Sequence, residues 1–110
     1  MRDDRVYLEH IAECIRRIEE NTADGKEAFA ASRTLQDAVL RNLQTMAEAT
    51  QRLSQGARNL RPDIEWDRLS AFRNILVHNY LGIDLERVWQ IVTQDVPALK
   101  AAVQEISTRL

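Results

Sequence analysis

The stretch that decides the fold is YLEHIAECIRRI, residues 7–18. Its apolar residues recur every three or four positions, at Tyr7, Leu8, Ile11, Cys14, Ile15 and Ile18. This spacing places them on one side of an α-helix, which predicts an amphipathic helix with a single buried stripe. Asp3 or Asp4 is expected to cap the start of this helix. The segment NTADG, residues 21–25, breaks the pattern and predicts a turn.

A second helix is expected to run to about Gln55, and to be kinked or preceded by a short turn near Phe29. Its predicted inner face consists of Leu35, Val39, Leu43, Met46, Ala49 and Leu53. Small residues on this helix, at Ala38, Ala47 and Ala49, would let another helix approach closely. Gly56 follows the periodic pattern and is expected to end the helix.

The remainder of the chain predicts a loop and further helices. Residues 57–66 contain Pro62 and are expected to form the loop. A third helix is expected over residues 67–79, capped by Asp67, and Gly82 is expected to end this unit.

Asp84 is expected to cap a fourth helix. Asp95 and Pro97 are expected to mark the restart of a final helix, with Pro97 in its first turn. The alternation typical of strands is absent from the sequence. We therefore predict an all-α fold, a four- to five-helix antiparallel bundle that forms one domain over residues 1–110.

Composition limits the classes of function. The 110 residues carry a formal net charge of −2, and the isoelectric point is about 5.7. The chain as a whole is therefore not a basic nucleic-acid binder, so that any RNA contact needs a local basic patch. Residues 52–73 are the candidate, because they hold Arg52, Arg58, Arg61, Arg68 and Arg73 against Asp63, Glu65 and Asp67. The alternative is a solvated arginine-rich face without function.

Cysteine and hydropathy patterns exclude further classes. Cys14 is the only cysteine, so an intrachain disulfide and a thiolate metal site are both excluded, and a buried inert thiol is expected. The sequence shows neither a run of about 18 apolar residues nor a signal-peptide pattern. We expect a cytoplasmic protein without membrane contact. With no metal-ligand cluster and no glycine-rich phosphate loop, no cofactor or metal is expected.

Residues 73–80, RNILVHNY, combine an arginine, a histidine and a tyrosine. An arginine can hold a phosphate, and a histidine can transfer a proton near neutral pH. On a regular helix, the five steps from Arg73 to His78 separate their side chains by about 140°, whereas Asn74 and His78 share a face. Either the helix ends near His78 and the chain turns, or a second copy of the helix completes the site. A two-fold dimer would supply the two proton-transfer groups that acid–base cleavage requires.

These residues carry a resemblance to a known family. The chain resembles the HEPN family, specifically the small HepT-like toxins, in its intact Arg-x4-His-x-Tyr motif at Arg73, His78 and Tyr80. The resemblance extends over nearly the whole chain, through RVYL at 5–8, AVLRNL at 38–43, PDIEW at 62–66, and the pairs at 88–89 and 96–97. One departure is Ala47 before Glu48 and Ala49, where the family usually has a glycine, which affects helix packing more than chemistry.

The resemblance implies a metal-independent endoribonuclease that acts as a homodimer on RNA and not on DNA. Arg73 would orient the scissile phosphate and stabilise charge in the transition state, and His78 would be a general acid or base. Asn74 would orient the phosphate or the imidazole. Glu48 would be a partner for Arg73 or simply exposed. The small alanines of the second helix and of the motif helix are the expected dimer contact.

The resemblance also implies a cognate antitoxin, a minimal nucleotidyltransferase that silences the toxin by adenylylating Tyr80. A bulky anionic AMP two residues from His78 would fill the cleft and repel RNA. An alternative function is a non-enzymatic helical partner or substrate-binding subunit of a nucleotidyltransferase. Without the resemblance, His78 could also be a helix cap, Tyr80 a core residue, and Arg73 a partner of Asp67 or Asp84. His10 is expected on the surface, and Trp66 and Trp89 in the core.

Overall fold

The computed structural model describes the backbone of residues 2–77 and 84–110, and the side chains of residues 3–72 and 84–110. These ranges form α-helices and one π-helical segment, η1, and they contain no strand. The elements in chain order are α1 (Arg2–Thr22), α2 (Lys26–Ala31), α3 (Arg33–Gln51), α4 (Gln55–Asn59), α5 (Trp66–Val77), α6 (Leu85–Gln90), η1 (Ile91–Asp95) and α7 (Val96–Arg109). The prediction of an all-α bundle is confirmed.

The first helix follows from its apolar stripe. Leu8, Ile11, Ile15 and Ile18 are buried, whereas the arginines and glutamates between them are exposed or half-buried. The helix ends at Thr22, whose hydroxyl donates to the Ile18 carbonyl over 2.8 Å. In the turn that follows, Gly25 has φ of 96° and ψ of 178°, a backbone conformation that is nearly restricted to glycine.

The predicted break near Phe29 is confirmed, since the short helix α2 holds Phe29 and α3 begins after Ser32. Ser32 has an extended backbone, and its hydroxyl accepts a hydrogen bond from the Leu35 N–H over 3.2 Å. This side chain therefore caps α3 and satisfies one of the amide groups that the helix start leaves unpaired.

The prediction for the end of α3 is wrong in two respects. The helix stops at Gln51 rather than near Gln55, and Gly56 lies inside α4 instead of ending a helix. The cause is Ser54, whose hydroxyl accepts from the Ala57 N–H and so starts a new helical turn within the predicted loop. Helix α5 begins at Trp66, one residue earlier than expected, so that Asp67 lies in its first turn.

The last part of the chain is more continuous than expected. The predicted cap at Asp84 is confirmed, because its carboxylate accepts from the Arg87 N–H over 3.1 Å. The predicted final helix is confirmed, since α7 begins at Val96 directly after Asp95, but Asp95 makes no capping bond, and η1 joins α6 to α7 without a break. Pro97 lies in the first turn of α7 as predicted, where the missing N–H costs little.

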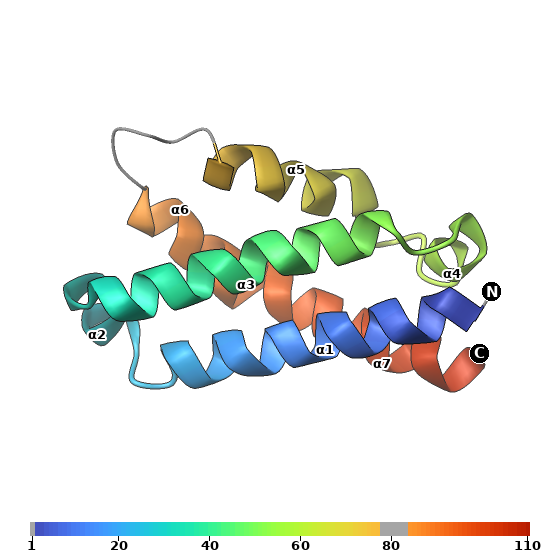
Figure 1. The fold of residues 1–110 in the computed structure, drawn as a ribbon, viewed down its shortest axis with the longest axis horizontal. Helices are drawn as coiled ribbons and strands as arrows, with labels where there is room; N and C mark the ends of the chain where they lie inside the picture. The colour runs from blue at the N-terminus through green and yellow to red at the C-terminus, as the bar shows by residue number, and fades with distance from the viewer. Residues whose placement is uncertain (1, 78–83) are drawn as a thin grey trace.

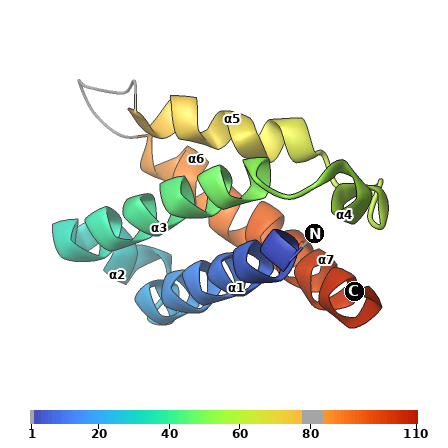
Figure 2. The ribbon, with the colours of Figure 1, turned by 45° about the vertical axis from the view of Figure 1, so that its right-hand side comes forward.

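The helices pack antiparallel around one core. Helix α3 lies between α1 and α5 and contacts both, and α7 runs back along α1 (Figures 1 and 2). The two ends of the chain lie side by side, where the Arg5 guanidinium donates to the Leu110 carbonyl over 2.9 Å. The largest fully buried side chains include Phe29, Phe72, Leu43 and Met46.

The alanines of α3 serve this packing. Ala47 and Ala49 are buried within the single chain, at 0% and 3% exposure, so the expected close approach of another helix is confirmed. The expectation that these two alanines form a dimer contact is wrong, because their methyl groups are already covered by the chain's own helices.

Candidate functional site

The helix that carries the predicted motif is α5. Arg73 and Asn74 lie on its backbone, about one turn before its last described residue, Val77. His78 and Tyr80 follow directly and lie outside the described residues, as do Gly82 and the side chains of Arg73 and Asn74. Their predicted roles in catalysis and modification therefore stay predictions.

Helix α5 is held firmly on the bundle. Trp66, Leu69 and Phe72 are buried at three-residue spacing, and Phe72 is 1% exposed. The Trp66 indole N–H donates to two carbonyl oxygens, of Arg58 at 3.2 Å and of Arg61 at 3.1 Å. These contacts fix the rotation of α5 about its axis and thus the position of the backbone that bears the motif. The expected core role of Trp66 is confirmed, and Trp89 packs against Phe29 with ring centroids 5.5 Å apart.

Helix α3 contributes Glu48 and a surface hollow. The hollow is lined by Arg41, Gln44, Thr45 and Glu48, which lie within two turns of one another. The Glu48 side chain is half-buried. Helix α5 packs against α3 and runs antiparallel to it (Figures 1 and 2).

The predicted basic window around residues 52–73 is largely neutralised by acids and carbonyl groups. Arg61 forms ion pairs with Asp63 at 2.8 Å and Glu105 at 3.1 Å, which raise the pKa of its guanidinium. Arg68 pairs with Asp95 at 3.3 Å. Two of these acids are distant in sequence, so the sequence alone could not show the pairing.

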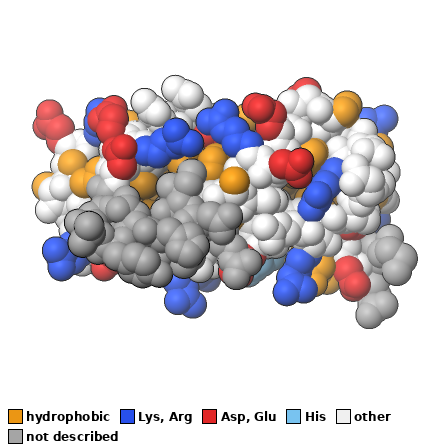
Figure 3. All heavy atoms as spheres, turned by 90° about the horizontal axis from the view of Figure 1, so that it is seen from above, with side chains coloured by type: hydrophobic (Ala, Val, Ile, Leu, Met, Phe, Trp, Pro, Cys, Tyr) orange, Lys and Arg blue, Asp and Glu red, His pale blue; other side chains and the backbone are white. Residues whose placement is uncertain are grey.

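The other arginines of this window whose side chains the structure describes are Arg58 and Arg52. The Arg58 guanidinium donates to the carbonyls of Thr50 and Gln51 at 2.9 and 2.8 Å and thus caps the end of α3. Arg52 is exposed, and it forms no ion pair with a described residue. On the face that carries α5, Figure 3 shows the described basic and acidic side chains interspersed, and these described side chains form no continuous basic patch.

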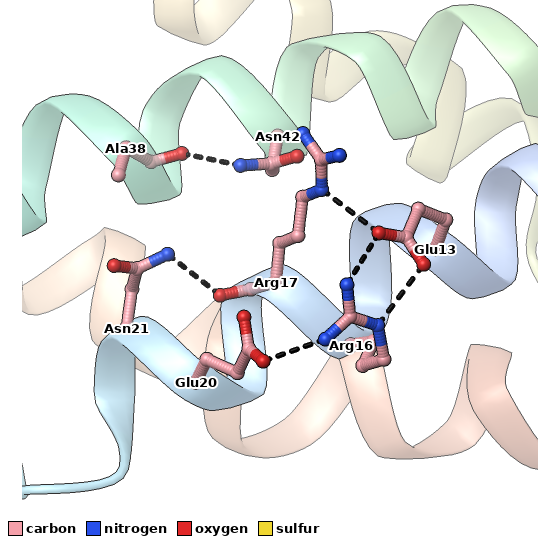
Figure 4. Close-up of polar contacts among 7 residues, drawn as sticks. All are labelled: Glu13, Arg16, Arg17, Glu20, Asn21, Ala38 and Asn42. Atoms are coloured by element: carbon pink, nitrogen blue, oxygen red, sulfur yellow. Dashed lines mark hydrogen bonds and ion pairs between the residues drawn. The ribbon is translucent and has the colours of Figure 1, made fainter.

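On the outer side of α1, arginines are likewise paired with acids (Figure 4). The Glu13 carboxylate accepts from Arg16 and Arg17 at 2.5 and 2.9 Å, and these hydrogen bonds lower its pKa to about 2. Arg16 also pairs with Glu20 at 2.6 Å. These arginines are thus engaged within their own helix.

The sequence did not reveal the role of Asp4. Its carboxylate is 4% exposed and accepts two hydrogen bonds from Ser54, from the N–H at 2.8 Å and from the hydroxyl at 2.7 Å. The predicted role as a cap for its own helix is thus replaced by a contact across 50 residues of sequence. The only local signal was Ser54 at the start of α4, and a serine does not indicate which distant residue it will bind.

Two other expectations can be checked. Cys14 is buried at 3% exposure, and burial raises the pKa of its thiol, as expected for an inert cysteine. His10 is exposed on α1, as predicted. In the ranges that the structure describes, no three His, Cys, Asp or Glu side chains converge on a metal position, and no helix has the length and apolarity to cross a bilayer.

Comparison with known proteins places the chain in a family. The family model described as "Ribonuclease HepT-like" matches residues 11–106. The chain therefore belongs to the HepT-like ribonuclease family. No solved structure matches the chain at a significant level.

Curated relatives agree with this assignment. A probable ribonuclease HepT of Thermococcus cleftensis is 35% identical over 106 residues, covering 96% of each chain. A candidate RNase of Caldanaerobacter subterraneus is 31% identical over 107 residues, again 96% of each chain. A protein of Methanocaldococcus jannaschii, named a gamma-glutamylcyclotransferase and candidate RNase, is 38% identical over 110 residues. The match covers 99% of this chain but only 50% of that relative, so the chain spans about half of its length.

Proposed function

We propose that this protein is a metal-independent endoribonuclease toxin that cleaves RNA through Arg73 and His78. The observation that carries the proposal is the family match over residues 11–106 together with an intact Arg-x4-His-x-Tyr motif at the end of α5. The buried anchors Trp66 and Phe72 support it, because a catalytic arginine needs a fixed backbone.

The chemistry follows from the residue types. A base removes the proton of a ribose 2′-hydroxyl, whose oxygen forms a bond to the neighbouring phosphorus while the bond to the 5′-oxygen breaks. An acid then gives a proton to that leaving 5′-oxygen. Arg73 stabilises the additional negative charge on the phosphoryl oxygens. The required 2′-hydroxyl restricts this reaction to RNA.

Two proton-transfer roles require two groups, and this motif supplies one histidine per chain. We propose that a homodimer brings two copies of α5 to one cleft, so that the partner's motif completes the acid–base pair. Asn74, four residues before His78, orients the imidazole or the phosphate. Glu48, half-buried on the helix that packs against α5, is proposed to hold the Arg73 guanidinium in position.

The proposal includes control by a cognate antitoxin of the minimal nucleotidyltransferase class, as in a type VII-like pair. Adenylylation of the Tyr80 hydroxyl would place an anionic phosphate two residues from His78. That group would compete with RNA for Arg73 and occupy the cleft, which silences the toxin without unfolding it.

The second candidate is a non-enzymatic helical subunit that binds a nucleotidyltransferase or its substrate. One observation favours it, namely that most arginines predicted to contact RNA are already paired. Arg61 and Arg68 each bind an acid, and Arg58 binds main-chain carbonyls.

Expression in a bacterial host separates the two candidates. The unaltered chain is expected to arrest growth and His78→Ala to relieve the arrest, while His10→Ala, which alters the other histidine on the exposed side of α1, stays toxic. Co-expression of the nucleotidyltransferase should restore growth, with a mass gain of one AMP on Tyr80. Growth that is equal for the unaltered chain and His78→Ala would favour the non-enzymatic subunit.

A further inference from the structure

The outward side of α3 carries two arginines without acidic partners. Arg41 lines the hollow with Gln44, Thr45 and Glu48, and Arg52 follows at the end of the helix. Both arginines are exposed, and neither forms an ion pair or side-chain hydrogen bond with a described residue. They contrast with Arg16, which two acids hold on α1.

Helical geometry places these arginines in line. Eleven residues separate Arg41 from Arg52, which is close to three full turns, so the two side chains leave α3 on nearly the same side about 16 Å apart. Gln44, Thr45 and Glu48 lie between them on this side. The result is a polar track along α3 with a cationic group towards each end.

The groups of this track match the backbone of a single RNA strand. A guanidinium binds a phosphate through two parallel hydrogen bonds. The Gln44 amide can donate and accept. The Thr45 hydroxyl donates to the Arg41 carbonyl over 2.9 Å, so its oxygen is left to accept from a ribose 2′-hydroxyl.

We propose that this side of α3, defined by Arg41, Gln44, Thr45 and Arg52, binds the sugar–phosphate backbone of the RNA strand beside the scissile phosphate. The inference rests on the proposed ribonuclease function and assigns its substrate-binding surface. The charge of the surface favours a polyanion, because two exposed arginines without acidic partners are attached about 16 Å apart along α3. Glu48 does not oppose this strand if, as proposed above, its carboxylate is engaged by Arg73.

Salt-dependent binding tests the proposal. Labelled single-stranded RNA is titrated against chains that carry His78→Ala to prevent cleavage, with affinity followed by fluorescence anisotropy at several salt concentrations. Each phosphate contact to a single strand adds about 0.7 to the slope of log K against log salt concentration. Arg41→Gln and Arg52→Gln are each expected to lower the slope by about 0.7 and weaken binding several-fold, and together by about 1.4.

Arg16→Gln is the matched control, because it removes the same charge from an arginine that Glu13 and Glu20 already hold. It should keep the parent's slope. Thr45→Val should reduce the preference for RNA over DNA of the same sequence, since it removes the oxygen that accepts from the 2′-hydroxyl. Circular dichroism is used to check that each variant is folded.

The proposal is overturned if the parent does not bind RNA, or if Arg41→Gln and Arg52→Gln keep its slope. Its failure can be told apart from failure of the nuclease proposal by assaying cleavage in chains with His78 intact. Cleavage that is equally fast in Arg41→Gln, Arg52→Gln and the unaltered chain would refute the α3 surface alone. Binding that depends on both arginines, without any cleavage, would refute the nuclease and retain the surface.

Discussion

Replacing Asp4 with alanine tests how the start of α1 secures the junction between α3 and α4. The Asp4 carboxylate is 4% exposed and accepts two hydrogen bonds from Ser54, at 2.7 and 2.8 Å. Hydrogen bonds to a charged group contribute about 1.5–3 kcal/mol each, and the desolvation of the carboxylate offsets part of this. We expect Asp4→Ala to lower the free energy of unfolding by about 2–4 kcal/mol.

Urea denaturation followed by circular dichroism measures the effect at pH 7. Asp3→Ala is the matched control, because it removes the same charge from the exposed neighbouring position and should cost less than about 1 kcal/mol. A double-mutant cycle with Ser54→Ala should give a coupling energy of about 1–3 kcal/mol. Equal losses of stability in Asp4→Ala and Asp3→Ala would show that the contact between Asp4 and Ser54 does not stabilise the fold.

The same contact sets a pH dependence. Burial alone raises the pKa of the Asp4 carboxyl, but the hydrogen bonds from the Ser54 hydroxyl and N–H outweigh it, so the pKa lies below its ordinary value. The contribution to stability is therefore complete above the unfolded pKa of about 3.9 and is lost as the pH falls through the lower folded pKa. The stability difference between the unaltered chain and Asp4→Asn should shrink below about pH 4. A difference that stays constant down to pH 2 would contradict this origin.

Four further predictions concern the bundle itself. Phe29→Ala should lower the free energy of unfolding by about 3–5 kcal/mol, because it empties a buried site and removes the ring contact with Trp89; urea denaturation measures it. Gly25→Ala should destabilise the chain by about 1–3 kcal/mol through its positive φ, since nothing lies within 4 Å of the added methyl group. Gly56→Ala, inside α4 with its nearest neighbour at 3.8 Å, should instead stabilise it by up to about 1 kcal/mol, and a Tm measurement would show the opposite signs. Cys14 should react with a thiol reagent only after unfolding, because burial raises its pKa; rapid reaction of the folded chain would contradict this.

The sequence predicted those parts of the fold whose signals are local. The stripe in residues 7–18, the break near Phe29 and the cap at Asp84 each depend on a few neighbouring residues, and each is confirmed. The final helix was also predicted, but Asp95 does not cap it, because its carboxylate pairs with a distant residue, Arg68, and the chain stays helical through η1.

The end of α3 shows the same limit. A glycine at position 56 is typical of a residue that follows a helix end, but Ser54 starts a new helical turn there. Ser54 is in turn bound by Asp4, which lies 50 residues earlier in the sequence. The basic surface could not be predicted either. Which arginines are neutralised depends on Glu105 and Asp95, which the fold brings to Arg61 and Arg68. Arg41 emerges as a candidate only once these pairs are known.

The most direct test of the proposed ribonuclease function is the rate of RNA cleavage by the purified protein in the presence of a chelator, with intact-mass measurement to confirm an unmodified Tyr80. The unaltered chain and His10→Ala are expected to cleave RNA at the same rate and to leave 2′,3′-cyclic phosphate ends. His78→Ala should be slower by about 10²–10⁴-fold, the usual contribution of a general acid or base. Unmodified protein that leaves RNA intact, or equal rates with and without His78, would contradict the proposed ribonuclease function.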